Sequence, residues 1–135
     1  MSDIKELKDK IKDVKILFVD DEEQIREGTG KFLKKFFDEV EICIDGLDGL
    51  AKFTKSFEEN GGFDIVIADI QMPKMDGVSM VKKIKELKPN IFVIFITASR
   101  GKYDIQEGLY DLYITKPISY DDIKLIMQKA SELEH

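Results

Sequence analysis

Five short apolar runs alternate with longer amphipathic segments along this chain. Each run holds four to six residues and is rich in Val, Ile, Leu and Phe, as expected of strands buried in a parallel sheet. The runs cover residues 14–19, 40–44, 65–68, 91–96 and 112–115. The other segments carry apolar residues three and four positions apart, which predicts helices. These helices are expected over residues 23–37, 47–58, 77–88, 101–110 and from residue 119 onward, the fourth being weak and polar.

This alternation predicts an α/β fold, a five-stranded parallel sheet with helices on both faces. Because crossovers between parallel strands are right-handed, few topologies are possible, and we expect the flavodoxin-like (βα)5 fold with strand order 2-1-3-4-5. The predicted domain spans residues 14–132. Residues 1–13 form an N-terminal extension, with Ile4, Leu7 and Ile11 at helical spacing. This short helix either packs on the domain or continues a helix of a partner or upstream module.

Composition narrows the class of protein. Hydrophobic residues make up 43% of the 135 residues, enough for a real core, and no apolar run approaches the roughly 20 residues of a membrane helix. The net charge of −6 argues against direct binding of nucleic acid. A single cysteine, Cys43, excludes an internal disulfide and fits a cytoplasmic location, with packing in a strand as its expected role.

The last three residues, 133–135, resemble the remnant of a purification tag and are left out of functional reasoning. They include His135, which is the only histidine of the chain. A histidine-based catalytic triad, a histidine-ligated metal and a phosphohistidine carrier role are therefore not expected.

Polar side chains follow four of the five predicted strands, at the edge where open α/β sheets place their ligands. They are Asp20 and Asp21 after the first strand, Asp69 after the third, Thr97 after the fourth and Lys116 after the fifth. Each alone has an ordinary structural explanation, such as a helix cap, a turn residue or a surface lysine. Their coincidence at one sheet edge favours a functional site.

The chemistry of these groups predicts a cation and a phosphoryl group. Three carboxylates in one crevice raise each other's pKa unless a cation intervenes, and their hard oxygen ligands favour Mg²⁺. Lys116 supplies a second cation and Thr97 a hydroxyl donor. A metal ion, an ammonium and a hydroxyl around one carboxylate suit the formation of an aspartyl phosphate.

Four motifs make the chain resemble the receiver domain of two-component response regulators over residues 14–131. They are VDDE at 19–22, DIQMPKMDG at 69–77, ITA at 96–98 and TKP at 115–117. The resemblance implies that Asp69 is the phosphoacceptor. It also implies that Mg²⁺ is held by Asp20, Asp21, Asp69 and the backbone carbonyl of Gln71. Lys116 would pair with the phosphoryl group, and small Ala98 would leave room for it.

The same resemblance implies partners and a switch. A sensor histidine kinase or phosphotransfer protein would donate the phosphoryl group, and a downstream effector or fused output domain would read it, with no membrane partner. Thr97 would move toward the phosphoryl group and Tyr113 would swing inward. This would alter the face formed by residues 101–110, the fifth strand and the last helix. The segment 107–113 departs from the usual family pattern, and a cis peptide is expected at Lys116–Pro117.

Two other functions compete with this one. A haloacid-dehalogenase-like phosphatase also uses Asp, Thr or Ser, Lys and Mg²⁺, but places its nucleophile on the first strand in an Asp-x-Asp pattern, whereas this chain has Asp20-Asp21-Glu22. A pseudo-receiver that acts only as a binding module would be expected to lack an acceptor, a metal ligand or the lysine. On the favoured interpretation the chain is no enzyme beyond phosphorylating and dephosphorylating itself.

Overall fold

A computed structural model describes residues 4–98, 105–106 and 108–133. Five parallel strands form one sheet in the order β2-β1-β3-β4-β5, which confirms the predicted flavodoxin-like topology. The strands are β1 (Lys15–Val19), β2 (Glu39–Cys43), β3 (Ile65–Asp69), β4 (Phe92–Thr97) and β5 (Leu112–Thr115). The helices are α1 (Ile4–Lys10), α2 (Glu23–Phe36), α3 (Gly46–Asn60), α4 (Gly77–Leu87) and α5 (Tyr120–Ser131).

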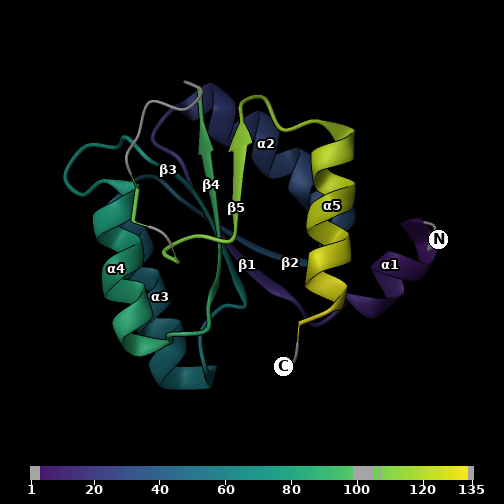
Figure 1. The fold of residues 1–135 in the computed structure, drawn as a ribbon, viewed down its shortest axis with the longest axis horizontal. Helices are drawn as coiled ribbons and strands as arrows, with labels where there is room; N and C mark the ends of the chain where they lie inside the picture. The colour runs from purple at the N-terminus through teal and green to yellow at the C-terminus, as the bar shows by residue number, and fades with distance from the viewer. Residues whose placement is uncertain (1–3, 99–104, 107, 134–135) are drawn as a thin grey trace.

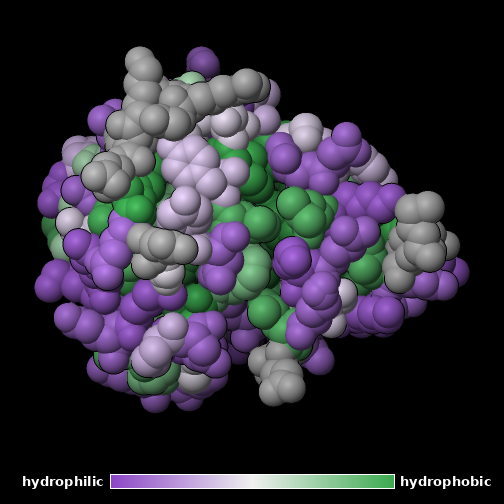
Figure 2. Space-filling view, viewed as in Figure 1, coloured by the Kyte–Doolittle hydropathy of each residue, from purple (hydrophilic) through white to green (hydrophobic). Residues whose placement is uncertain are grey.

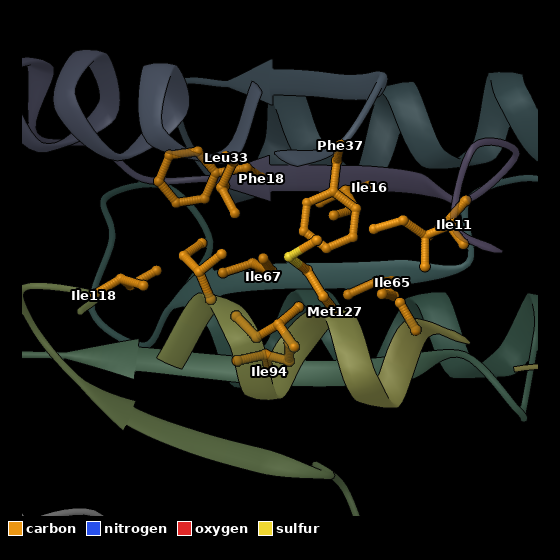
Figure 3. Packing of buried hydrophobic residues seen from close by; sticks show 14 of the residues in the cluster. Ile11, Ile16, Phe18, Leu33, Phe37, Ile65, Ile67, Ile94, Ile118 and Met127 are labelled. Carbon is orange, nitrogen blue, oxygen red and sulfur yellow. The ribbon is translucent and has the colours of Figure 1, made fainter. Parts of the chain in front are cut away.

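The helices cover both faces of the sheet, with α2 and α5 on one side and α3 and α4 on the other (Figure 1). Alternate residues of each central strand enter two separate hydrophobic cores, because successive strand side chains point to opposite faces. In β3, Ile65 and Ile67 pack toward α2 and α5, whereas Val66 and Ala68 pack toward α3 and α4. Figure 3 shows the first core, where Met127 of α5 meets the isoleucines of the sheet. Every residue of β3 is buried.

The N-terminal extension packs on the domain. Leu7 and Ile11 are 2% and 1% exposed and belong to the core between the sheet, α2 and α5. Helix α1 lies beside the C-terminal part of α5 (Figure 1). The sequence left open whether this helix packs on the domain or continues a helix of another module. In the structure it packs on the domain, so residues from Ile4 onward add apolar surface to the core.

Half of the helix expected over residues 101–110 falls outside the described residues. Those of its residues that are described, 105–106 and 108–110, are not helical, which corrects the prediction for this part of the chain. Ile105 and Tyr110 instead pack against the core on the α4 side. Gly108 has a φ of 89°, a backbone conformation that side chains disfavour, which explains why the helical pattern fails here.

Two glycines allow the segment after β3 to lie against its neighbours. A Cβ added to Gly77 would overlap the carbonyl oxygen of Asp69, and one added to Gly46 would overlap the carbonyl oxygen of Met75. The amide of Gly77 donates to the carbonyl of Ile70 at 2.8 Å, and the side chain of Asp76 caps α4 by accepting from the amide of Ser79 at 2.7 Å. These contacts fix the backbone that follows Asp69.

Cys43 is fully buried at the end of β2. Burial raises the pKa of its thiol to about 12, so the group stays protonated and serves packing, as predicted.

Among the described residues no helix has the length and apolar character needed to span a bilayer. Figure 2 shows a mostly hydrophilic face, with apolar atoms gathered where β5 meets α5.

We predict that Gly77→Ala lowers the free energy of unfolding by about 1 to 3 kcal/mol, because the new methyl group forces the backbone at Asp69 to shift. Gly28→Ala is the matched control. Gly28 lies at a solvent-exposed position in the middle of α2, with open space around the missing Cβ. Its replacement by Ala should therefore raise the free energy of unfolding by about 0.5 to 1 kcal/mol. Urea denaturation of both variants tests this, and equal effects would contradict it.

Candidate functional site

The strand register brings the predicted site residues to one level of the sheet. Val19 at the end of β1 pairs with Ala68 of β3, so Asp20 and Asp69 follow from neighbouring positions. Thr97 pairs with Thr115, the residue before Lys116. The amide of Lys116 donates to the carbonyl of Thr97 at 2.7 Å, which continues the ladder past the last strand residue.

Lys116 lies between the carboxylates of two other strands. Its Nζ is 2.8 Å from Oδ2 of Asp69 and 2.9 Å from Oδ2 of Asp20. Its third acidic neighbour is Glu22, whose Oε1 lies 3.6 Å away. The Lys116 side chain is 6% exposed and that of Asp20 is fully buried, so the two short contacts are shielded from water. The Lys116–Pro117 peptide is cis, as expected.

Backbone amides hold the two carboxylates in place, and a guanidinium holds the backbone of Asp20. Oδ1 of Asp20 accepts from the amide of Glu22 at 2.9 Å, and Oδ1 of Asp69 accepts from the amide of Gln71 at 3.3 Å. Nη1 of Arg26 donates to the carbonyl oxygen of Asp20 at 3.0 Å. Each carboxylate therefore has one oxygen fixed by the local turn and the other directed to Lys116.

Burial and the ion pairs shift the pKa of both partners. Burial raises the pKa of Asp69 above its usual 3.8, and the opposing hydrogen bond and charge of Lys116 do not cancel this effect. Burial lowers the pKa of Lys116, but its short contacts with the Asp69 and Asp20 carboxylates outweigh burial and hold that pKa above the usual 10.5. Because one ammonium contacts two carboxylates, with a carboxylate oxygen of Asp21 close to both, negative charge is in surplus at the site.

Carboxylate oxygens of Asp20, Asp21 and Asp69 lie within 4.8 Å of one another. Although Oδ2 of buried Asp20 contacts the Lys116 ammonium, it accepts no hydrogen bond of good geometry. Such an under-coordinated oxygen, beside two more hard oxygen donors and a charge surplus, fits a small divalent cation of the Mg²⁺ type. No other group of three such acids occurs in the described part of the chain.

A pocket of about 130 Å³ opens at this edge of the sheet. Its lining comprises Asp21, Glu22, Asp69, Gln71, Thr97, Ala98 and Lys116. Larger hollows of about 320 to 340 Å³ lie at the opposite end of the strands, lined among others by Asn60 and Phe63. Size is a poorer guide than chemistry here, because only the smaller pocket contains the converging carboxylates and the buried ammonium.

The structure brings nearly all the predicted site residues together. Thr97 is 2% exposed and lines the pocket beside Ala98. Tyr113 lies farther away, half-buried against the core on the α4 side, with its ring 5.9 Å from that of Tyr110. Two residues in contact with the site were missed by sequence reasoning, Glu22 and Arg26. Glu22 adjoins the acidic pair, which is a signal that the sequence carried, whereas the contact of Arg26 depends on the direction of its side chain.

The fold and the carboxylate–lysine site together define a class of signalling domain. The family profile of the response regulator receiver domain matches residues 16–128. The chain belongs to this family, as the motifs indicated, and is a response regulator receiver domain of two-component systems.

Curated relatives agree with this assignment. The chain is 34% identical over 113 residues to the transcriptional regulatory protein DltR of Streptococcus agalactiae, covering 82% of this chain and 48% of DltR. It is 33% identical over 124 residues to the response regulator protein VraR of Staphylococcus epidermidis, covering 90% of this chain and 58% of VraR. It is also 35% identical to hybrid signal transduction histidine kinase L of Dictyostelium discoideum, covering 85% of this chain but 7% of that protein. The chain thus spans about half the length of DltR and VraR.

Solved structures share the fold. The response regulator TrrA of Thermotoga maritima, in complex with Mg²⁺ and BeF, superposes with a TM-score of 0.72 at 29% identity, covering 87% of this chain and 98% of TrrA. A CheY-like receiver domain protein of Methanospirillum hungatei gives a TM-score of 0.71 at 31% identity, covering 88% of this chain and 94% of the other.

We predict that Lys116→Met lowers the free energy of unfolding by about 3 to 5 kcal/mol in chelator, because two buried carboxylates lose their ammonium. Without Lys116, the pKa of folded Asp69 should rise further above its unfolded value. The loss is then full above the folded pKa and fades as the pH falls toward 3.8.

Lys74→Met is the control for this substitution. Its side chain is 63% exposed and its ammonium lies 3.6 Å from Asp45, so its loss should change stability by at most about 1 kcal/mol. Denaturation of both variants between neutral and acidic pH tests the prediction. An unfolding free energy for Lys116→Met within 1 kcal/mol of the Lys74→Met value would refute the charge argument.

Proposed function

We propose that this receiver domain takes a phosphoryl group onto Asp69 from a phosphohistidine of a sensor histidine kinase or phosphotransfer protein. The observation that carries the proposal is the short contact between Lys116 Nζ and Asp69 Oδ2, beside two further carboxylates. Asp69 ends a strand that is buried throughout, yet it lines the open pocket, so a rigid element presents a reachable oxygen.

In the proposed reaction a carboxylate oxygen of Asp69 forms a bond to phosphorus. The bond between phosphorus and the donor's imidazole nitrogen breaks, and its electron pair leaves with the imidazole. Lys116 balances the negative charge that gathers on the phosphoryl oxygens, and the Thr97 hydroxyl on the pocket wall donates to one of them. Asp20, Asp21, Asp69 and the backbone carbonyl of Gln71 would hold Mg²⁺, which when bound supplies positive charge for the same oxygens.

Phosphorylation is proposed to act as a switch rather than as a step of turnover. A dianionic phosphoryl group attracts the Thr97 hydroxyl, and the displacement gives Tyr113 space to move inward. The affected face comprises the segment between β4 and β5, β5 itself and α5. This chain spans about half of DltR and of VraR and 7% of the hybrid kinase, and DltR is named a transcriptional regulatory protein. We therefore infer that a fused output domain or a separate effector in the cytoplasm reads this face.

Asp69 is predicted to be the sole phosphorylation site. Incubation with acetyl phosphate and Mg²⁺ should add the mass of one phosphoryl group, measured by intact-mass spectrometry. Asp69→Asn should add none, since an amide oxygen is a poor nucleophile, while Asp64→Asn, just before the first residue of β3, is the matched control and should still react. A full phosphoryl mass on Asp69→Asn would sink the assignment.

Phosphorylation should also require Mg²⁺ held by the acidic pair. Excess chelator should abolish the mass gain, and Asp21→Asn should weaken the Mg²⁺ dependence of both phosphorylation and thermal stability. Asp121→Asn, which removes an exposed acid from the first turn of α5, controls for net charge. Equal phosphorylation with and without chelator would eliminate the metal from the mechanism.

The switch predicts a response far from the pocket. Beryllofluoride, which mimics the phosphoryl group of an aspartyl phosphate, should change amide chemical shifts around Tyr113 and along residues 105–131 as well as at Asp69. Tyr113→Ala should keep the changes at the pocket and lose those along α5. Shifts confined to the pocket in the unaltered protein would refute the switch and leave the phosphoacceptor assignment intact.

A further inference from the structure

Glu22 is a charged group of the pocket that the proposed reaction does not use. Its backbone amide fixes Asp20, and its side chain, 59% exposed, stands at the pocket wall with Oε1 3.6 Å from Lys116 Nζ. The three acids whose oxygens converge within metal-ligand distance do not include it. Its carboxylate therefore faces the space through which a phosphodonor approaches.

The charges around the opening make this position sensitive. Lys116 already contacts Asp69 and Asp20 at 2.8 and 2.9 Å, and Glu22 is its third and most distant carboxylate. Of the three contacts of Lys116, only that with Glu22 is exposed to solvent. It is therefore the weakest and breaks most easily when another anion binds the ammonium. An incoming phosphoryl group thus meets a like charge at the opening and a competitor for the ammonium.

We propose that Glu22 is a specificity-determining residue that disfavours anionic phosphodonors in proportion to their charge. The inference rests on the proposed function. With acetyl phosphate, Asp69 forms the bond to phosphorus and the phosphorus–oxygen bond to the acetyl group breaks, with the electron pair leaving on acetate. With phosphoramidate, the phosphorus–nitrogen bond breaks and ammonia leaves with its electron pair and the proton already on the donor nitrogen. Acetyl phosphate carries the larger negative charge at neutral pH, so Glu22 opposes it more strongly.

The test compares initial phosphorylation rates of the full chain by intact mass at saturating Mg²⁺. Glu22→Gln should accelerate the reaction with acetyl phosphate about tenfold and that with phosphoramidate about threefold, since the repulsion scales with donor charge. Glu22→Asp keeps the charge and should stay within about twofold of the unaltered rate. In high salt, where the Debye length is about 3 Å, the acceleration should shrink to about twofold.

Glu23→Gln is the matched control, because it removes the same charge one residue away, from an exposed position that does not line the pocket. It should change neither rate by more than about twofold. Equal acceleration by both substitutions would overturn the proposal in favour of a long-range charge effect, and no acceleration by Glu22→Gln would also overturn it.

Magnesium titrations followed by NMR test whether Glu22 is itself a metal ligand. Glu22→Gln should match Glu23→Gln in Mg²⁺ affinity within about threefold, and a larger loss for Glu22→Gln would overturn the proposal by making Glu22 a ligand. If the unaltered protein is phosphorylated on Asp69 without the donor-dependent change, only this inference fails. If neither it nor any variant gains a phosphoryl group, the proposed function fails and the inference with it.

Discussion

The ammonium of Lys116 joins three strands that are not all neighbours in the sheet. It extends from β5 to the carboxylates that follow β3 and β1, at 2.8 and 2.9 Å. No backbone hydrogen bond of the sheet connects β5 directly to β3 or β1, because β4 lies between β5 and β3. This contact directs one oxygen of each carboxylate to the ammonium, while the local turn holds the other oxygen.

A sheet buried on both faces is what allows such a site to exist. The side chains of β3 alternate between two apolar cores, and both cores fix the strand that presents Asp69. The backbone beyond it is held in turn by Gly77, whose missing side chain lets α4 begin against the carbonyl of Asp69. A pocket with surplus carboxylate charge is unfavourable in itself, and the apolar packing on either side of it keeps that pocket folded.

The fold and most of the site were predictable because both depend on periodicity. Continuous apolar runs marked the strands, and parallel strands necessarily end at one edge, so Asp20, Asp69, Thr97 and Lys116 could be brought together without coordinates. The segment before β5 was not predictable in this way. Its apolar spacing suggested a helix, whereas Gly108 adopts a positive φ and Tyr110 packs onto the core. Spacing also does not reveal that Arg26 would bond the backbone of Asp20, because that contact depends on side-chain direction.

On the proposed function, the charge surplus also explains how one modification affects distant parts of the domain. Lys116 already contacts two carboxylates, so a phosphoryl group on Asp69 would enlarge a deficit of positive charge. The groups that would offset this negative charge belong to different elements. Thr97 lies on β4, Lys116 follows β5, and the acids after β1 would hold a metal ion. On the proposed function, the new charge therefore pulls on the two strands at one edge of the sheet. On the same proposal, Tyr113, which packs against the core on the α4 side, converts the local electrostatic change into a change of surface shape.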